Sequence, residues 1–331
     1  MGYRAEKLKQ DKKYAILKRV LLCAVAVIVL AICVFSAFVP SATWKYYVNK
    51  PKVGKRGEGE LRMHFIDVGQ GDATILELPD GKTALIDGGD EGASATVMRY
   101  LNALKIKTID YLIMTHTDSD HCGGLDTVLK YKEVKAAYIP SASANENTQY
   151  AQVYAELLEQ SCQKAFASRS VEIVGENYKL SFLYPYTYET GEGTEEDYNS
   201  QTDSSVLWLD YNGVNALFMG DAPSETEELL LRDSALGLFE KRKVDLHSVE
   251  ILKVAHHGSP YSCSEEFLSA LGLKTAVISC GENNIYGHPA SATIKRLHDV
   301  NAEIYRTDTQ GHIILTVSPS GEYTVKTVPS A

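Results

Sequence analysis

Apolar and polar positions alternate in blocks along the chain, and the first apolar block is the longest. Residues 20–39 contain no charged side chain, which is enough to cross a hydrocarbon core as an α-helix. Seven Lys/Arg and two acidic residues precede this block, and basic flanks stay on the cytoplasmic side of a membrane. The pattern predicts a basic cytoplasmic tail over residues 1–19 and a transmembrane anchor over residues 20–40. A cleaved signal peptide is the alternative, but its apolar core is usually shorter.

Short apolar runs then alternate with amphipathic stretches. Residues 41–60 carry three glycines and no apolar periodicity, which predicts a linker. A helix is expected to open at a capping box formed by Ser224 and Glu227, and residues 187–199 are expected to form a surface loop. Strands alternating with helices predict a layered α/β body over residues 61–331. The main strands are expected at 63–68, 73–78, 83–87, 111–114, 171–174, 180–184, 206–211, 214–219, 274–279, 312–317 and 323–328, and further helices at 94–104, 150–163 and 291–298.

Three apolar runs end in residues that bind metals. The run 111–114 is followed by Thr-His-Thr-Asp-Ser-Asp-His, the run 216–219 by Gly-Asp, and the run 251–255 by His-His. Close carboxylates repel one another unless a cation neutralises them, and imidazole with carboxylate is a normal ligand set for zinc, manganese or iron. Strand carboxyl ends are where α/β proteins place their sites. The pattern predicts a metal site with the candidate ligands His116, Asp118, Asp120, His121, Asp221, His256 and His257.

These motifs resemble those of the metallo-β-lactamase fold. The sequence His116-x-Asp118-x-Asp120-His121 is similar to that superfamily's HxHxDH motif, with an aspartate in place of the second histidine. Together with Gly69-Gln70-Gly71-Asp72, His256-His257-Gly258-Ser259 and Tyr286-Gly287-His288-Pro289, it resembles the hydrolase domain of ComEC-family competence proteins. The resemblance implies a four-layer αββα sandwich, here preceded by one transmembrane helix.

The resemblance also implies one or two divalent metals, Zn or Mn. Asp221 would bridge two positions, and Asp87 would support the metal-binding loop without binding the ion. The superfamily's third histidine motif would fall near residues 199–205, where this chain has no histidine. The position of His116 and Asp118 would therefore bind more weakly, and a single bound metal remains an open alternative.

Asp120 and His288 are the expected catalytic residues, because an imidazole on a loop can donate a proton near neutral pH. Neighbouring residues that leave a strand point to opposite sides, so one of His256 and His257 should bind metal, and we favour His256. For Asp72 two interpretations stay open: a carboxylate that accepts turn amides, or a contact with substrate.

Charge limits the partners. The net charge is −10, and it is −15 without residues 1–40, so no extended basic track for nucleic acid is visible.

The resemblance implies a membrane-anchored, extracytoplasmic phosphodiesterase or nuclease that uses metal-bound hydroxide. Its substrate would be nucleic acid or a cell-envelope phosphoester such as a phosphocholine ester. The alternative is a non-catalytic module that binds DNA or an envelope polymer through a degenerate site. The sequence leaves the oligomeric state open.

Overall fold

The computed structural model describes residues 2–38, 41–143, 146–186, 199–200 and 202–330. It divides the chain into two compact units, Met1–Val48 and Asn49–Ala331. The surface loop expected over residues 187–199 lies outside the described residues up to residue 198.

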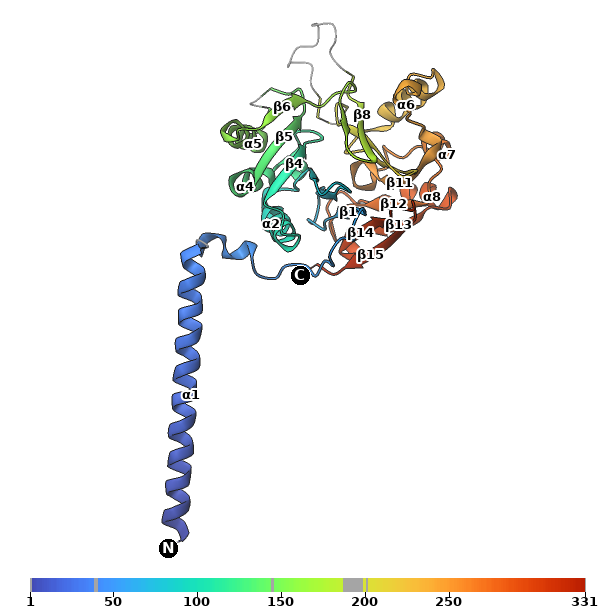
Figure 1. Cartoon of the computed structure of the whole chain (residues 1–331). Helices are drawn as coiled ribbons and strands as arrows, with labels where there is room; N and C mark the ends of the chain where they lie inside the picture. Colours follow the sequence, from blue (N-terminus) through green and yellow to red (C-terminus); the bar gives the residue numbers. More distant parts are fainter. Residues whose placement is uncertain (1, 39–40, 144–145, 187–198, 201, 331) are drawn as a thin grey trace. The chain divides into compact units, whose positions relative to one another are not determined.

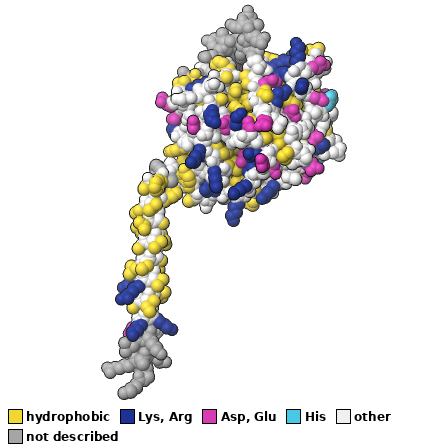
Figure 2. Space-filling view, viewed as in Figure 1, with side chains coloured by type: hydrophobic (Ala, Val, Ile, Leu, Met, Phe, Trp, Pro, Cys, Tyr) yellow, Lys and Arg dark blue, Asp and Glu magenta, His cyan; other side chains and the backbone are white. Residues whose placement is uncertain are grey.

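The first unit contains one long helix, α1 (Gly2–Phe38), and a short 3-10 helix, η1 (Ser41–Tyr46). Helix α1 continues without a break from the predicted tail into the predicted span, whose residues 39–40 lie outside the described residues. Its part Gln10–Phe38 is long and apolar enough to cross a membrane, and apolar side chains cover its surface (Figure 2). The predicted apolar amino-terminal helix is therefore confirmed.

The second unit is built on two sheets (Figure 1). Among the described residues, the first sheet has the strand order β15-β14-β1-β2-β3-β4-β5-β6 and the second has the order β13-β12-β11-β10-β9-β8-β7. The strands of the first sheet are β1 (Leu61–Phe65), β2 (Thr74–Glu77), β3 (Thr83–Ile86), β4 (Thr108–Ile113), β5 (Glu133–Ile139), β6 (Gln163–Phe166), β14 (His312–Val317) and β15 (Tyr323–Val328). The strands of the second are β7 (Glu172–Val174), β8 (Tyr178–Tyr184), β9 (Val206–Tyr211), β10 (Val214–Phe218), β11 (Val249–Lys253), β12 (Thr275–Ile278) and β13 (Glu303–Arg306).

Helices cover the outer face of each sheet. Those beside the first sheet are α2 (Ser94–Ala103), α4 (Leu125–Tyr131) and α5 (Thr148–Glu159), and those beside the second are α6 (Ser224–Ala235), α7 (Glu265–Ala270) and α8 (Ser291–Asp299) (Figure 1). Shorter helices are η2 (Glu91–Ala93), α3 (Ser119–Cys122), η4 (Glu240–Arg242), η5 (Leu246–Ser248), η6 (Ala255–Gly258) and α9 (Thr307–Gln310).

Apolar side chains from both sheets form the central core. Phe65 of β1 and Phe218 of β10 stack with ring centroids 6.1 Å apart, and both side chains are buried. Burying each such side chain contributes roughly 1.5–3 kcal/mol. A second core lies between the second sheet and its helices, where Trp208, Phe267 and Leu297 pack together. The layers therefore run helix, sheet, sheet, helix, as the sequence predicts.

Strand direction brings the predicted ligands toward one another. β3, β4 and β5 run parallel in the first sheet, and β10, β11 and β12 run parallel in the second. The carboxyl ends of β4, β10 and β11 carry the three motifs that contain the candidate ligands. β1 pairs in antiparallel register with β14, with Leu61 opposite Val317, so distant segments close the first sheet.

Two local predictions were wrong. The helix expected over residues 150–163 ends at Glu159, and residue 163 begins β6. The expected capping box is absent, because Pro223 is the N-cap of α6 and no side chain caps that end. Glu227 instead turns inward, is fully buried, and accepts hydrogen bonds from Cys263 N at 2.5 Å and Ser264 N at 2.9 Å. A contact between α6 and the segment after η6 thus replaces the local cap.

Candidate metal centre

A buried carboxylate joins the ends of β3 and β4. Asp87 follows β3 in a left-handed conformation, with a φ of 57°, and is 1% exposed. Its Oδ1 accepts a hydrogen bond from Thr115 N at 2.8 Å, and its Oδ2 accepts one from Thr115 Oγ1 at 2.7 Å. His121 Nδ1 lies 2.9 Å from the same Oδ2. Asp87 therefore fixes the His121 ring, which matches the supporting role that the resemblance implies.

Three buried histidines are oriented through their Nδ1 atoms. Each Nδ1 lies 2.9 Å from an oxygen atom: His116 from Thr115 Oγ1, His121 from Asp87 Oδ2, and His257 from Ser279 O. Carboxylates and backbone carbonyls only accept, so Nδ1 carries the proton in His121 and His257. Thr115 gives its own proton to Asp87 and so accepts from His116. The three Nε2 atoms then present lone pairs, which is how metal-binding histidines are held.

These Nε2 atoms provide the test of whether a metal fits. The Nε2 atoms of His116, His121 and His257 are buried and have no hydrogen-bond partner among the described residues, and the same holds for Asp221 Oδ1. Buried polar atoms are normally satisfied. Imidazole nitrogen and carboxylate oxygen atoms gathered in this way fit a divalent transition metal.

The carboxylate at the end of β10 lies at the centre of the cluster. Asp221 is 3% exposed, and its backbone N donates to Ser204 Oγ at 2.9 Å. The preceding Gly220 has a φ of 52°, and a Cβ at this position would collide with Ser204 Oγ. Glycine is therefore required where the strand turns Asp221 toward the histidines.

Distances show that all seven predicted ligands come together. Asp221 Oδ1 lies 3.1 Å from the Nε2 atom of His121, and its Oδ2 lies 3.7–3.8 Å from those of the other three histidines. Each predicted ligand lies within 3.8 Å of another. The remaining pairs are Asp118 Oδ2 with His116 Nε2 at 3.7 Å and Asp120 Oδ2 with His257 Nε2 at 3.2 Å.

The charges in this cluster favour a cation. Burial, together with the charge of His121, lowers the pKa of His116 to about 4. Burial also lowers the pKa of His121, but the carboxylates of Asp221 and Asp87 outweigh it and raise that pKa well above its usual value. Burial would raise the pKa of Asp221, yet the charges of His121 and His257 bring it well below its usual range. The negative charge that favours a proton on His121 would also favour a metal ion.

The geometry favours His257 over His256 as a ligand, contrary to our preference from the sequence. His257 is 2% exposed and its Nε2 faces the cluster, whereas the His256 side chain is 22% exposed. In an extended chain, neighbouring side chains point to opposite sides, but the backbone at His256 and His257 is not extended. Both residues lie in η6 with left-handed φ values of 48° and 54°. Both side chains consequently face Asp221 instead of opposite sides.

Asp72 joins the cluster although it is not among the seven predicted ligands. Asp72, His121, Asp221 and His257 each offer one ligand atom, and these atoms lie within 4.8 Å of one another. Asp72 does not satisfy turn amides as one interpretation held; its Oδ2 lies 2.6 Å from Lys253 Nζ. The signal that could have found it is Lys253 within the otherwise apolar run 251–255, because a buried cation needs a carboxylate partner.

His288 lies beside the cluster on the loop between β12 and α8. Its ring centroid is 5.6 Å from that of His256 and 6.4 Å from that of His257. Its Nδ1 is buried and has no hydrogen-bond partner in the described part of the chain. Burial, and then the charge of His256, lowers the pKa of His288. The ring therefore lies within reach of a group bound at the cluster.

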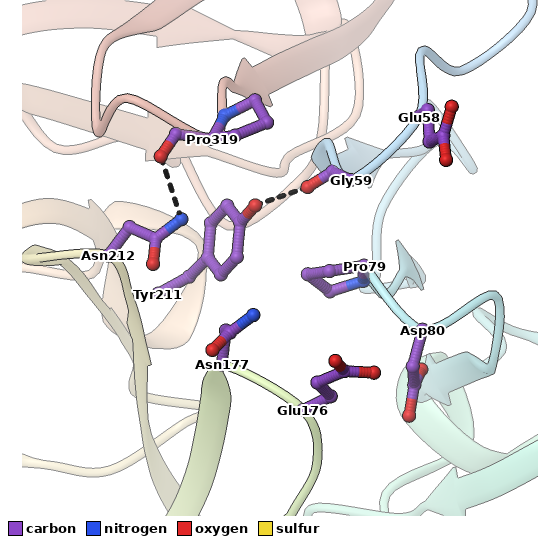
Figure 3. A pocket seen from close by; sticks show the side chains of 9 residues that line it. All are labelled: Glu58, Gly59, Pro79, Asp80, Glu176, Asn177, Tyr211, Asn212 and Pro319. Carbon is purple, nitrogen blue, oxygen red and sulfur yellow. Dashed lines mark hydrogen bonds between the residues drawn. The ribbon is translucent and has the colours of Figure 1, made fainter.

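Serine side chains occupy the region of the missing third histidine motif. Ser204 Oγ accepts from Asp221 N and lies 3.4 Å from His116 Nδ1, while Ser205 N donates to Thr115 O at 2.9 Å. Ser204 and Ser205 therefore help to position Asp221, His116 and Thr115. A separate cavity is lined by residues none of which is a predicted ligand (Figure 3): Glu58, Gly59, Pro79, Asp80, Glu176, Asn177, Tyr211, Asn212 and Pro319.

The architecture agrees with comparisons with known proteins. Residues 66–282, about two thirds of the chain, match the family model of the metallo-β-lactamase superfamily. This chain belongs to the metallo-β-lactamase superfamily. The matched range begins just after β1 and includes the three ligand-bearing motifs at the ends of β4, β10 and β11.

Within the metallo-β-lactamase superfamily, the chain resembles competence proteins, as the sequence motifs predict. It is 31% identical to ComE operon protein 3 of Bacillus subtilis (strain 168) over 77% of this chain and 33% of that protein. It is 28% identical to competence protein ComA of Neisseria gonorrhoeae over 77% of this chain and 32% of that protein. The chain thus spans about a third of the length of these relatives. Among solved structures, the metallo-β-lactamase fold protein YhfI from Bacillus subtilis matches 80% of this chain and 100% of its own, with 10% identity and a TM-score of 0.47.

Proposed function

We propose that this protein is a membrane-anchored, metal-dependent phosphodiesterase, related to nucleases, whose catalytic domain lies outside the cytoplasm. The observation that carries the proposal is the buried set of histidine Nε2 atoms around Asp221 that no described residue satisfies. The similarity to competence proteins supports nucleic acid as the substrate class. The basic start of α1 supports a cytoplasmic amino terminus.

Two groups of residues share Asp221 as a common ligand. His121, His257, Asp120 and Asp72 would hold one divalent ion, Zn or Mn, and His116 with Asp118 would hold a weaker second one. A bound ion would acidify a water molecule toward neutral pH, and a pair of ions suits the attacking and leaving oxygens of a phosphodiester. Asp118 is the most exposed of these ligands, with 36% of its side chain accessible, which supports weaker binding there.

Two further residues would act on the reacting groups. Burial would raise the pKa of Asp120, but the imidazoles of His257, whose Nε2 lies 3.2 Å from Asp120 Oδ2, and of His121 hold that pKa below its usual range. Asp120 therefore stays ionised and would orient the attacking water by accepting a hydrogen bond from it. His288, with an unsatisfied Nδ1 beside the cluster, would donate a hydrogen bond or a proton to a phosphate or leaving-group oxygen.

The test uses the full chain in detergent and bis(p-nitrophenyl) phosphate. Hydrolysis is expected with Mn²⁺ or Zn²⁺, no hydrolysis is expected with EDTA, and Asp120→Asn should lose both activity and bound metal. Asp126→Asn is the matched control, because the hydrogen bonds that the described residues give to this nearby carboxylate come from Thr127 N and Lys130 Nζ in α4. Metal bound at full stoichiometry without hydrolysis of any phosphodiester would instead support the non-catalytic binding module.

The proposed orientation has a separate test. Protease added to intact cells should cut the catalytic domain and leave the amino terminus protected. Protection of the whole chain would contradict the extracytoplasmic placement.

A further inference from the structure

Exposed apolar side chains lie in the two segments of the chain that carry His257 and His288. Ile285 is 91% exposed and Tyr261 is 76% exposed, the two highest values for large apolar side chains among the described residues from Asn49 onward. Tyr286, next to Ile285, is 64% exposed. Tyr261 closely follows η6, which carries His257. Large apolar side chains exposed together at a site commonly mark a binding surface.

The loop that carries Ile285 and Tyr286 is tied to the metal-binding segment and is internally braced. Ala290 N donates to Gly258 O at 2.8 Å, which fixes the end of the loop against η6. Asn284 Nδ2 donates to Gly281 O at 2.9 Å and to His288 O at 2.5 Å, and its Oδ1 accepts from His288 N at 3.0 Å. The exposed tip is therefore held in place and is ready to receive a ligand without first being ordered.

Aromatic rings lead from this tip to the metal cluster. The rings of Tyr286 and His288 are 5.9 Å apart with an interplanar angle of 26°, and those of His288 and His257 are 6.4 Å apart with an angle of 28°. His257 is the buried ligand whose Nε2 faces Asp221. We call these three rings the ladder: each ring is stacked on the next with the planes inclined by 26° or 28°, and the outer ring, Tyr286, is mostly exposed.

We propose that Tyr286 stacks against an unpaired nucleobase next to the scissile phosphodiester, and that Ile285 covers the edge of that base. The inference rests on the proposed phosphodiesterase function and narrows its substrate to single-stranded nucleic acid. A planar group would continue the ladder, and aromatic–base stacking tolerates any sequence. A base inside a duplex has both faces covered, so it cannot use this surface.

The charge of the protein agrees with stacking as the source of affinity. Without residues 1–40 the net charge is −15, so phosphate contacts outside the metal cluster contribute little. A quaternary ammonium group, such as choline, is instead bound over several ring faces that surround it. The ladder is an open stack of planes, which fits a base better than such a group.

The experiment measures fluorescence anisotropy of two labelled single strands of equal length, an oligothymidylate and an abasic oligonucleotide. The full chain is kept in detergent with EDTA, so binding is measured without turnover. The two strands carry the same phosphates and differ only in their bases. Wild-type protein should bind oligothymidylate about tenfold more tightly than the abasic strand, the preference that one stacked base supplies.

Variants identify the ring responsible. Tyr286→Ala should bind oligothymidylate as weakly as the abasic strand, whereas Tyr286→Phe should keep the preference. Tyr131→Ala is the matched control, because this half-exposed tyrosine ends α4, just before β5 begins and so at the opposite end of that strand from the site. Each variant's melting temperature should stay close to that of the wild type.

Any of three results with the two strands would overturn the inference. The first is equal binding of both strands by the wild type. The others are an unchanged preference in Tyr286→Ala and an equal loss of affinity for both strands in that variant. A Tyr286-dependent preference for a phosphocholine ester over oligothymidylate would assign the ring to a quaternary ammonium group and overturn it too. Cleavage is measured separately with Mn²⁺, so a preference for bases without any cleavage would contradict the proposed catalysis alone.

Discussion

The substitution Asp87→Asn tests the cluster through a residue that does not face the ion. The carboxylate accepts three hydrogen bonds, two from Thr115 and one from His121 Nδ1. Asparagine has nearly the same shape but offers one oxygen and one NH₂ group. If its oxygen accepts from Thr115 N, its NH₂ group faces His121 Nδ1. The His121 proton must then move to Nε2, the atom that faces the metal.

The alternative amide orientation does not remove the problem, because the NH₂ group would then meet the Thr115 N–H. One amide orientation therefore moves the His121 proton to Nε2, and the other places the NH₂ group against the N–H donor of Thr115. Loss of such a supporting hydrogen bond typically lowers metal affinity by about 10–100-fold, which corresponds to roughly 1.4–2.7 kcal/mol. We expect Asp87→Asn to lower the affinity for metal by this amount, although all the proposed ligands are still present.

The assay is competition for Zn²⁺ between the full chain in detergent and a chromogenic chelator of known affinity. Asp110→Asn is the matched control, because Asp110 is also a buried carboxylate and accepts from Thr83 N at 2.9 Å, but it lies within β4 away from the cluster. The melting temperatures of the metal-free Asp87→Asn and Asp110→Asn proteins, compared with that of the wild type, show whether either substitution lowers stability in general. If Asp87→Asn binds Zn²⁺ as tightly as Asp110→Asn and the wild type, the orientation argument is wrong.

Two further predictions concern metal content and pH. Asp221→Ala should remove all bound metal and Asp118→Ala should leave close to one ion per chain, as measured by elemental analysis; the opposite pattern would require the ligands to be reassigned. Burial lowers the pKa of His312 from 6.5 to about 4, so between these values the unfolded chain binds a proton that the folded chain does not. Stability should therefore fall by up to about 3 kcal/mol as the pH drops through this window. His312→Asn, whose Oδ1 takes the position of Nδ1 as an acceptor for Asp67 N, should melt progressively closer to the wild type from pH 6.5 to 4; a constant difference would refute this.

Short-range patterns in the sequence predicted most of the fold and the outline of the site. Apolar runs ending in His or Asp identify strand ends, and parallel strands bring such ends to one edge. The motif around His116 and the aspartate after β10 are found in this way without knowledge of how the strands are ordered. The layered architecture follows from the same alternation of runs.

Features that depend on long-range pairing or unusual backbone conformation could not be predicted. Asp72 joins the cluster because Lys253, distant in sequence, neutralises it. The choice between His256 and His257 depends on two successive left-handed residues, which a rule for extended strands does not describe. Glu227 does not cap α6, although the local sequence predicts that it does. Its carboxylate instead accepts hydrogen bonds from the backbone N–H groups of Cys263 and Ser264, which are distant in sequence.

The pairing of β1 with β14 also determines when the first sheet can be completed. Every residue of β1 is buried in the finished sheet, and one of its two edges is covered only by β14. At about 5–20 residues per second, ribosomes need roughly 10–50 s to make the chain between these strands. During that time the first strand keeps an unpaired edge while the rest of the body is made. A nascent chain of this protein therefore needs protection of β1 from aggregation until the last strands emerge.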